Sequence, residues 1–339
     1  MSSLALVTGA SGFIGRHLVP ALLRRGDRVR CLVRESSEMD HLRQPGVELN
    51  FASLDDAQAL TGAVADVDVV YHLAGLTRAL DPQEMFRVNR DGAAHLAAAC
   101  ARQPQPPKLV LVSSVAAAGP IAAGQVRSEA DPPAPVSIYG RSKLAGEEAA
   151  KAFADHVPLT IVRPGIVFGP QNRAMLPIFK AIKYFNFHLV PSYRSPPLSY
   201  IYVDDLVEML VRAAEQGSTI PASGQPGAAG QGYYFAVDSE HPTYADLGRM
   251  AGNLLHRPLA IIFHCLGPAP WIIAGANEWI CRLRGKPDEL NLDKMREATV
   301  SSWACSAERA NRELAFRPPV SLAERLRQTI DWYRQAHWL

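Results

Sequence analysis

The stretch that decides the fold is Ala5-Leu6-Val7-Thr8-Gly9-Ala10-Ser11-Gly12-Phe13-Ile14-Gly15. A short apolar run leads into three glycines spaced three residues apart, and apolar residues then recur at helical spacing. This pattern predicts a buried strand, a tight turn and the N-terminus of a helix, whose unpaired N–H groups and dipole favour an anion such as a pyrophosphate. The spacing is G-x-x-G-x-x-G rather than G-x-G-x-x-G, so the glycines taken alone could also serve only the turn.

Composition is that of a folded globular protein. The chain has 339 residues, of which 48% are hydrophobic and 20% charged, and its net charge of +2 gives no argument for nucleic acid as a partner. The five cysteines are scattered without a CxxC pair, which favours unpaired thiols in a reducing compartment and predicts no metal site. We expect a cytoplasmic protein without a membrane span, because no signal peptide precedes the first strand and glycine and prolines interrupt the longest apolar stretch, 258–281.

Strand-like and helix-like segments alternate along the first half of the chain. This alternation predicts an α/β fold, a Rossmann-type doubly wound parallel sheet with right-handed crossovers. We assign residues 1–170 to a dinucleotide-binding domain, to which a strand and helix around 198–216 return. Residues 171–339 form mainly a smaller, mostly helical substrate-binding region. After the first strand and helix, the expected strands span 28–34, 47–51, 67–73, 108–113 and 159–163, and the expected helices 55–64, 82–102 and 137–155.

The second half has shorter and less regular elements. We expect a strand at 233–237, a helix at 243–256, and a final helix that opens with a capping box at Ser321–Glu324. The segment 268–284 reads as an amphipathic helix. Packing on the small region is its simpler interpretation, and contact with a membrane or with the pocket is the alternative.

The tip of the second strand bears on the choice of nicotinamide cofactor. An acidic residue there would accept a hydrogen bond from the ribose 2′-OH of NAD, whereas an arginine accommodates the 2′-phosphate of NADP. Arg34 stands at this tip with Arg30 nearby, which favours NADP. Glu35 follows immediately and leaves NAD as the alternative.

Tyr139 and Lys143 lie one helical turn apart on one face of a predicted helix. An ammonium near a phenol favours the phenolate and lowers the pKa of the tyrosine toward neutrality. Such a phenol can protonate an alkoxide as hydride reaches a carbonyl carbon, or accept the proton in reverse. Taken alone the pair is more often structural, so its interpretation depends on the other motifs.

Six motifs occur in the order that is typical of extended short-chain dehydrogenases/reductases. The resemblance covers essentially the whole chain, and Ser114 and Tyr139, 25 positions apart, match the spacing of that family's active site. It implies a Rossmann fold and an NAD(P)-dependent enzyme. The motifs are TGASGFIG at Thr8–Gly15, HLAG at His72–Gly75, Asn89, Ser113-Ser114, YxxxK at Tyr139–Lys143 and RPGIVFGP at Arg163–Pro170.

The resemblance also implies a role for each matching residue. Tyr139 would be the acid/base, Lys143 would bind the nicotinamide ribose and tune Tyr139, and Ser114 would orient the carbonyl. Asn89 would support the fourth helix and a proton-relay water. One departure is Ser53-Leu54, which stands where the family often has an Asp-Leu pair that contacts adenine. The residues expected to bind the cofactor are Gly9, Ser11, Gly12, Phe13, Ile14, Gly15, Arg34, Ser53, Leu54, Leu73, Ala74, Gly75, Ser113, Tyr139, Lys143, Pro164, Gly165 and Val167.

Two departures from the family's sugar-modifying branches bear on the reaction. Dehydratases carry an Asp-Glu pair beside the catalytic hydroxyl, and Val115-Ala116 offers no carboxylate. Nucleotide-sugar enzymes usually carry an arginine that clamps the diphosphate just before the strand near Tyr200, where Pro197-Leu198-Ser199 stands here. Arg194, a few residues upstream, could take its place.

The substrate half is rich in apolar residues that form either core or pocket, among them Phe179, Tyr193, Phe263 and Trp271. We therefore expect a reductase or alcohol dehydrogenase that resembles dihydroflavonol reductases and 3β-hydroxysteroid dehydrogenases and acts on an apolar ketone, aldehyde or secondary alcohol. A nucleotide-sugar epimerase is the first alternative, and a non-catalytic NADP(H)-binding sensor protein is the second.

Relatives pair through two helices, here about 82–102 and 137–155, and the resemblance therefore predicts a homodimer. Small side chains on these helices would allow close four-helix packing. They are Ala93, Ala94, Ala97, Ala98, Ala145, Ala149 and Ala152.

Overall fold

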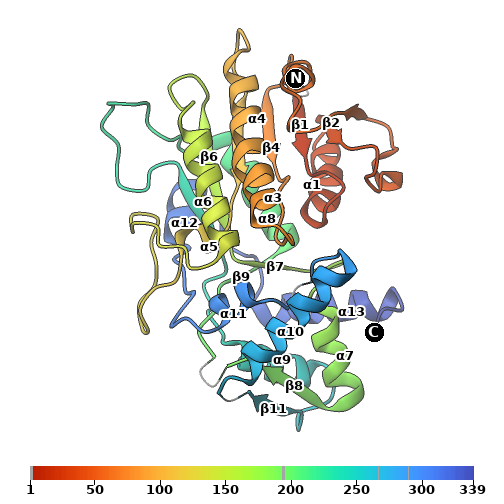
Figure 1. Ribbon diagram of the computed structural model, residues 1–339. Coiled ribbons are helices and arrows are strands. Elements are labelled where there is room, and N and C mark those ends of the chain that lie inside the picture. Colours follow the sequence, from red (N-terminus) through yellow and green to blue (C-terminus); the bar gives the residue numbers. More distant parts are fainter. Residues whose placement is uncertain (1–2, 193–194, 266, 289) are drawn as a thin grey trace.

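Seven parallel strands form the central sheet of the computed structural model, which describes residues 3–192, 195–265, 267–288 and 290–339 (Figure 1). From edge to edge the order is β10-β6-β5-β4-β1-β2-β3. The chain winds outward from β1 to β3 and then crosses to β4 on the other side of β1, so the winding reverses between β1 and β4. This confirms the predicted doubly wound α/β sheet. The strands are β1 (Leu4–Thr8), β2 (Arg28–Val33), β3 (Val47–Phe51), β4 (Val69–His72), β5 (Lys108–Val112), β6 (Leu159–Pro164) and β10 (Tyr233–Ala236).

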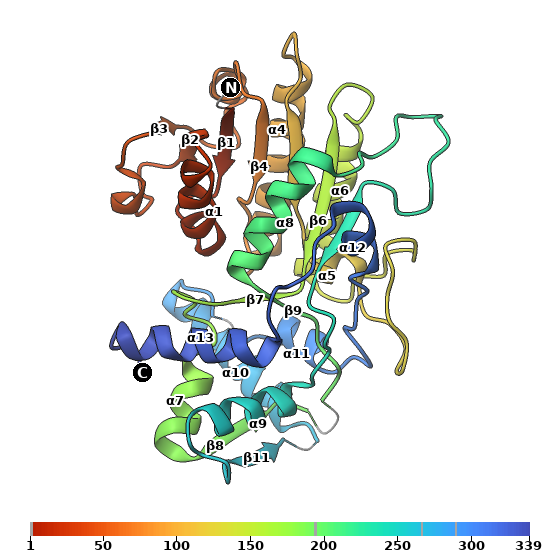
Figure 2. The same ribbon diagram turned by 180° about the vertical axis from the view of Figure 1, so that it is seen from behind.

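Helices cover both faces of this sheet. On one face α4 (Gly92–Ala101) and α6 (Ile138–Lys151) lie side by side (Figure 1), and α2 (Ala57–Ala63) packs against α4. The other face carries α1 (Phe13–Arg24) and α8 (Val203–Gln216), which lie in front when the molecule is seen from behind (Figure 2). Buried aliphatic side chains fill the space on each side, because strands covered on both faces are apolar throughout.

The helix predicted at 82–102 consists of three consecutive pieces. α3 (Pro82–Phe86) leads into a π-helical turn, η2 (Arg87–Asp91), which continues as α4. A Cβ added to Gly146 of α6 would lie 2.2 Å from the Asn89 carbonyl oxygen. α6 therefore approaches the π turn at a distance that only glycine permits, and the turn carries Asn89 toward the carboxyl edge of the sheet.

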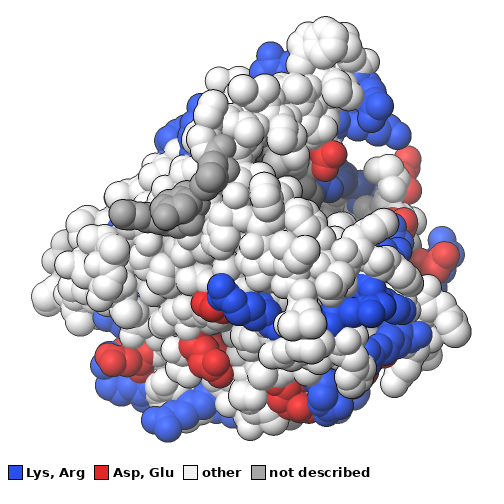
Figure 3. Space-filling model, turned by 90° about the horizontal axis from the view of Figure 1, so that it is seen from below, with Lys and Arg blue, Asp and Glu red and all other residues white. Residues whose placement is uncertain are grey.

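The second region lies below the sheet in both ribbon views and is seen from below in Figure 3. Two short parallel ribbons pair β7 (Ile166–Phe168) with β9 (Tyr200–Tyr202) and β8 (Phe187–Val190) with β11 (Ile261–His264). Of the predicted strand and helix near 198–216, only the helix packs on the central sheet, because the strand β9 pairs with β7. The helices of this region are α7 (Leu176–Phe185), α9 (Tyr244–Leu254), α10 (Ala269–Arg284), α11 (Leu292–Ala298) and α13 (Leu322–Gln335); α5 (Val115–Ala118), α12 (Glu308–Leu314) and the 3-10 turn η1 (Asp40–Leu42) complete the described elements.

The helix starts in this region differ in one detail from the prediction. The Ser321 hydroxyl accepts a hydrogen bond from the Glu324 N–H at 3.3 Å, which is half of the expected capping box. The reciprocal pair of bonds occurs instead at Thr243 and Asp246, where α9 begins. Among the described residues, no helix is both long enough and apolar enough to cross a membrane.

Candidate active site

The glycine turn after β1 lies where the winding of the sheet reverses, and its glycines allow backbone segments to pack closely against one another. Gly9 adopts φ +71°, and a Cβ there would lie 2.7 Å from the Ala74 N atom, against the turn that follows β4. A Cβ on Gly15 would lie 2.5 Å from the Ala10 carbonyl oxygen. These two glycines are therefore required for close packing of backbone against backbone.

The N-terminus of α1 is suited to an anion. Its first residue is Phe13 and its N-cap is Gly12, which supplies no side-chain hydrogen bond, and no acidic residue lies in the first turn. A Cβ on Gly12 would meet only the Gly9 carbonyl oxygen within 4 Å, so the outer side of the turn is open. Unpaired N–H groups, the helix dipole and an open glycine turn together fit the pyrophosphate of a dinucleotide. Ser11 lies in this turn, and Ile14 packs on the core below it.

Asn89 links the strand β4 to helix α6. Its side-chain oxygen accepts a hydrogen bond from the Leu76 N–H at 2.8 Å, and its amide nitrogen donates to the Leu76 carbonyl and to the Ser142 hydroxyl, each at 2.9 Å. A Cβ on Gly75 would lie 3.0 Å from Asn89 Oδ1 and 3.5 Å from Lys143 Nζ. The structure thus brings three predicted site residues, Gly75, Asn89 and Lys143, into one cluster.

The backbone after β4 is anchored to β1. The Leu73 N–H donates to the Thr8 carbonyl at 3.2 Å, and the Ala74 N–H donates to the Thr8 hydroxyl at 3.3 Å. That hydroxyl also lies 2.7 Å from Nδ1 of His72. Burial, together with the charge of Lys143, lowers the pKa of His72 to about 3, so this histidine is a neutral structural group.

Tyr139 lies in the first turn of α6, next to the start of α5. A Cβ on the neighbouring Gly140 would lie 2.3 Å from the Ala116 carbonyl oxygen, so α6 and α5 pack backbone to backbone. Burial raises the pKa of Tyr139, while Lys294 and a hydrogen bond with Ser114 act in the opposite direction. Ser114, the N-cap of α5, and Tyr139 therefore lie close to each other where α5 and α6 meet.

Lys143 points from α6 toward the sheet. Its ammonium donates a hydrogen bond to the Val112 carbonyl oxygen at 2.7 Å. Burial lowers the pKa of Lys143 to about 8, and the carboxylate of Glu147 opposes that shift. The cation over the Tyr139 ring belongs instead to Lys294, whose Nζ lies 5.4 Å from the ring centroid.

Helix α11 reaches the N-terminus of α6 from the far end of the chain. Asp293 accepts hydrogen bonds from the backbone N–H groups of Ile138 (2.8 Å) and Tyr139 (3.1 Å). Ser137 donates to Glu297 at 2.6 Å, and Glu297 also holds Lys294 at 2.7 Å. The sequence analysis missed this contact because no periodicity or motif relates segments more than 150 positions apart.

A buried ion pair joins α6 to β6 next to the candidate site. The Arg163 guanidinium binds the Glu147 carboxylate through two hydrogen bonds of 2.9 and 2.6 Å, and the Glu147 side chain is fully buried. The Ser113 hydroxyl also donates to Glu147, which turns this predicted cofactor-binding side chain toward the core. Both charged residues are visible in the sequence, but only the fold shows that they pair.

The predicted adenine end of the site lies at the tips of β2 and β3. Arg34 is exposed directly after β2, whereas Arg30 is held by Glu48 and by the carbonyls of Ala63 and Ala65, away from that tip. Ser53 is exposed, and Leu54 packs against Gly92 of α4.

The predicted nicotinamide end follows β6. Pro164 pairs with Ala236 in the sheet, and Val167 lies in β7. A Cβ on Gly165 would lie 2.4 Å from the Ser199 carbonyl oxygen, so β7 and the segment before β9 can approach closely. The glycine turn, the Gly75 turn, Ser114 and Gly165 all follow carboxyl ends of parallel strands, where ligands of such sheets bind.

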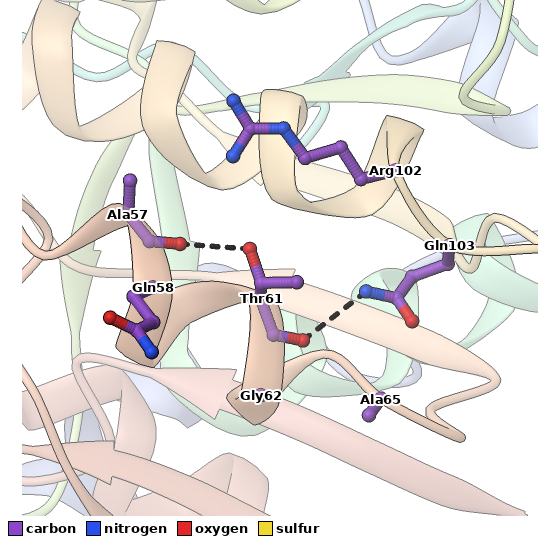
Figure 4. A pocket seen from close by; sticks show the side chains of 7 residues that line it. All are labelled: Ala57, Gln58, Thr61, Gly62, Ala65, Arg102 and Gln103. Atoms are coloured by element: carbon purple, nitrogen blue, oxygen red, sulfur yellow. Dashed lines mark hydrogen bonds between the residues drawn. The ribbon is translucent and has the colours of Figure 1, made fainter.

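A hollow elsewhere on the surface contributes nothing to this site. It lies between α2 and the end of α4, and the residues that line it are Ala57, Gln58, Thr61, Gly62, Ala65, Arg102 and Gln103 (Figure 4). The end of α4 leads into β5, so the hollow is at the amino edge of the sheet, opposite the glycine turn. Within the described residues there is also no group of three or more His, Cys, Asp or Glu side chains placed to hold a metal ion.

Comparison with known proteins agrees with this geometry. A ceramide reductase of Caulobacter vibrioides is 31% identical over 98% of the chain and 95% of its own length. A UDP-glucose 4-epimerase of Mycolicibacterium smegmatis is 29% identical over 97% and 98%. The crystal structure of gox2253 superposes with a TM-score of 0.77 at 26% identity and covers all of both chains. The family model of NAD-dependent epimerases and dehydratases matches residues 5–225, and the chain therefore belongs to the NAD-dependent epimerase/dehydratase family, as an NAD(P)-dependent enzyme of the extended short-chain dehydrogenase/reductase type.

Proposed function

We propose that this enzyme is an NADP-dependent oxidoreductase that transfers hydride between nicotinamide and an apolar ketone, aldehyde or secondary alcohol. The observation that carries the proposal is the placement of Tyr139 and Lys143 one turn apart in α6, with Ser114 close to Tyr139 and with Gly75 and Asn89 close to Lys143. Two hydroxyls side by side can hold one carbonyl oxygen, and one of them can move a proton to it.

The proton in this scheme belongs to Tyr139. Because burial raises its pKa, the phenol stays protonated near neutral pH, which suits an acid that donates to the oxygen of a carbonyl during reduction. The hydrogen bond with Ser114 and the charge of Lys294 stabilise the phenolate that forms as the proton leaves. When bound, the nicotinamide supplies or accepts the hydride.

The other site residues would bind and orient. We assign the pyrophosphate to the glycine turn at Gly9–Gly15 and the nicotinamide ribose to Lys143. Pro164, Gly165 and Val167 would lie against the nicotinamide. Arg34 supports NADP over NAD, because its exposed guanidinium at the tip of β2 can bind a 2′-phosphate by donating hydrogen bonds to its oxygens.

The apolar substrate is argued from the groups near the reacting hydroxyls. Val115 and Ala116, which follow Ser114, are buried and carry no carboxylate, so no side chain there can assist an elimination. Ser199, where sugar-nucleotide enzymes place groups for the diphosphate, is buried and bonded to the Trp303 carbonyl and the Cys305 N–H. The similarity to a ceramide reductase, named for a lipid substrate, also supports an apolar carbonyl compound.

A nucleotide-sugar epimerase remains the second candidate. The epimerase of M. smegmatis matches nearly the whole chain, and Lys294 places a cation close to Tyr139. The alternative diphosphate ligand considered above, Arg194, lies outside the described residues, as does Tyr193 of the apolar set.

The test is a screen of the purified enzyme with NADPH and NADH against apolar ketones and aldehydes, read as loss of nicotinamide absorbance. We expect faster oxidation of NADPH than of NADH. UDP- and GDP-sugars are tested separately by thermal shift, because a ligand that binds only the folded state raises the melting temperature. A shift by UDP-sugars without carbonyl turnover would replace the proposal by the epimerase. NADPH binding without any turnover would replace it by a sensor protein.

We also propose a homodimer formed through α4 and α6. Ala93 and Ala97 are buried in the core of the subunit, so the surface available for pairing is made by their neighbours. Ala94, Ala98, Ala145 and Ala149 are partly exposed, and Ala152 is exposed. Light scattering at micromolar concentration should give twice the subunit mass, and a monomer mass would contradict the dimer.

A further inference from the structure

Helix α10 exposes apolar side chains on the face that points away from the protein. Its inner face is made by Pro270, Ala274 and Cys281, which are buried at helical spacing. On the opposite face Ile272, Trp279 and Leu283 are 66%, 64% and 68% exposed. A surface helix normally turns polar residues to solvent, so this helix lacks the partner that its outer face requires.

The ribbon of β8 and β11 continues this pattern directly before α10 in the chain. The parallel register pairs Ile261 with Phe187 and Phe263 with Leu189, and paired residues share one face of a ribbon. His188 and Val190, which alternate with Phe187 and Leu189 along β8, are buried, whereas Leu189, Ile261 and Phe263 are 46%, 61% and 51% exposed. The outer face of the ribbon is therefore apolar as well. We call these outward side chains of α10, β8 and β11 the apolar surface.

The charges around the apolar surface are almost all positive. The segments 176–190 and 256–284 contain one acidic residue, Glu278, and it pairs with Arg282 at 2.8 Å. Basic residues are more numerous in these segments: two lie within α7, one precedes β11, and two end α10, after which Lys286 and then Asp288 follow. They are Lys180, Lys183, Arg257, Arg282 and Arg284, followed by Lys286.

Figure 3 shows this end of the molecule from below. Uncharged atoms cover much of it, and Lys and Arg side chains lie toward its margins together with several acidic side chains. Exposed tryptophan, phenylalanine and isoleucine beside arginine and lysine are the combination that inserts side chains at the level of lipid head groups and attracts anionic lipids.

We propose that the apolar surface docks on an anionic membrane, with the outer face of α10 inserted at the level of the head groups and the basic residues against the lipid phosphates. The positive margin argues for this occupant. A second copy of the chain would bring the same basic margin against itself, whereas an anionic bilayer complements it.

Helix α10 lies close to Tyr139, so docking through α10 would bring the reacting hydroxyl near the membrane. α10 packs on α11, where a Cβ on Gly275 would lie 3.8 Å from Leu292 and Asn277 donates to the Leu290 carbonyl at 2.7 Å. α11 is the helix whose Lys294 lies over Tyr139. A lipid-facing helix is thus one helix away from the reacting hydroxyl.

The experiment is co-sedimentation of the full chain with vesicles, which needs no substrate and therefore does not depend on the proposed activity. We expect binding to phosphatidylcholine vesicles with about one-third phosphatidylglycerol, and a loss of binding as NaCl rises from about 0.05 to about 0.5 M. Trp279→Glu and Leu283→Glu should each weaken the partition coefficient about tenfold, because a large apolar side chain no longer inserts.

The matched control is Val126→Glu, which places the same charge at an apolar position of similar exposure, 52%, outside the apolar surface. It should bind as the wild type does. A double change, Arg284→Glu with Lys286→Glu, should weaken binding to the anionic vesicles in proportion to their charge. Melting temperatures of all variants show that the fold is retained.

Two results would overturn the proposal. One is equal binding by the wild type and Trp279→Glu. The other is an absence of vesicle binding together with light scattering in which Trp279→Glu converts a dimer into a monomer, which would assign α10 to a contact between copies of the chain.

Discussion

The carboxyl edge of the sheet and the apolar surface at the lower end of the molecule contrast in how their side chains are satisfied. At the edge of the sheet several buried polar groups are paired inside the protein, as with Glu147 and Arg163 or Asn89 and Ser142. At the apolar surface Trp279 and Leu283 are 64% and 68% exposed in the part of the chain that the structure describes. The buried polar groups of the first region are paired within the chain, whereas the apolar side chains of the second region are exposed.

This contrast implies different sensitivities to substitution. When one member of a closed cluster is removed, its partner is left buried and unpaired. The cost of that unpaired group lowers the free energy of unfolding or raises the barrier of the reaction. An open surface loses little stability when its side chains change, because they contact little. Each prediction below therefore compares a change near the site with a similar change in the second region.

Tyr139→Phe should have the largest effect. Removal of the phenolic hydroxyl eliminates the proposed acid/base, and kcat should fall by about 10²–10⁴-fold. NADPH binding, followed by fluorescence, should remain. The control Tyr184→Phe changes an exposed tyrosine at the end of α7 and should retain full turnover. Equal turnover by Tyr139→Phe and the wild type would remove the basis of the proposed reaction.

Glu147→Gln should cause the largest loss of stability. The change leaves the Arg163 guanidinium buried without its counter-charge, and breaking such a pair costs about 3–5 kcal/mol of unfolding free energy. Glu278→Gln removes the carboxylate that pairs with the mostly exposed Arg282 in α10 and should cost less than about 1 kcal/mol. Urea unfolding of both variants measures the difference, and equal losses would contradict the contrast between closed and open regions.

Gly9→Ala tests the close packing of the glycine turn. Gly9 and Gly285 adopt similar left-handed conformations, with φ +71° and +66°, so alanine is strained at both. Only at Gly9 would the added Cβ meet backbone, whereas at Gly285 nothing lies within 4 Å. Gly9→Ala should therefore lose about 2 kcal/mol more than Gly285→Ala and also weaken NADPH binding. Similar losses in the two variants would mean that φ alone, and not the approach of Ala74, requires glycine.

The same contrast explains what the sequence could predict. The sheet and the glycine turn follow from short-range patterns, because strand periodicity and left-handed turns restrict residue types locally. The set of Ser114, Tyr139 and Lys143 was expected from the resemblance to a family whose motifs occur in this order. Asp293 and Lys294 could not be found in this way. Their contacts with Ile138 and Tyr139 depend on how the second region packs on the first, and isolated charges in a polar helix carry no signal of it.

The position of the edge strand β10 in the sheet could not be predicted from local patterns either. The strand Tyr233–Ala236 was expected from its composition, but its place beside β6 in the central sheet depends on long-range pairing. For the apolar surface, the residues can be recognised in the sequence but their exposure cannot. Its side chains are apparent in the sequence, where core and surface cannot be distinguished, and only the structure reveals that Ile272 and Leu283 stay exposed among the described residues.

The most gradual expected effect, because it appears only as pH changes, separates a buried lysine from an exposed one. Burial lowers the pKa of Lys143 to about 8, below the ordinary value of 10.5 that it regains on unfolding. Between these values the unfolded chain binds more protons than the folded one, so this group makes the unfolding free energy rise with pH, by at most about 1.4 kcal/mol per pH unit. Below pH 8 both states are protonated and the contribution is constant. Lys143→Met removes this rise, so the stability of the wild type relative to the variant should increase from pH 8 to 10, while Lys286→Met, at an exposed position beyond α10, should follow the wild-type curve. Parallel curves for Lys143→Met and the wild type in urea unfolding would mean that Lys143 keeps its ordinary pKa, and that the hydrogen bond to Val112 and the charge of Glu147 fully offset its burial.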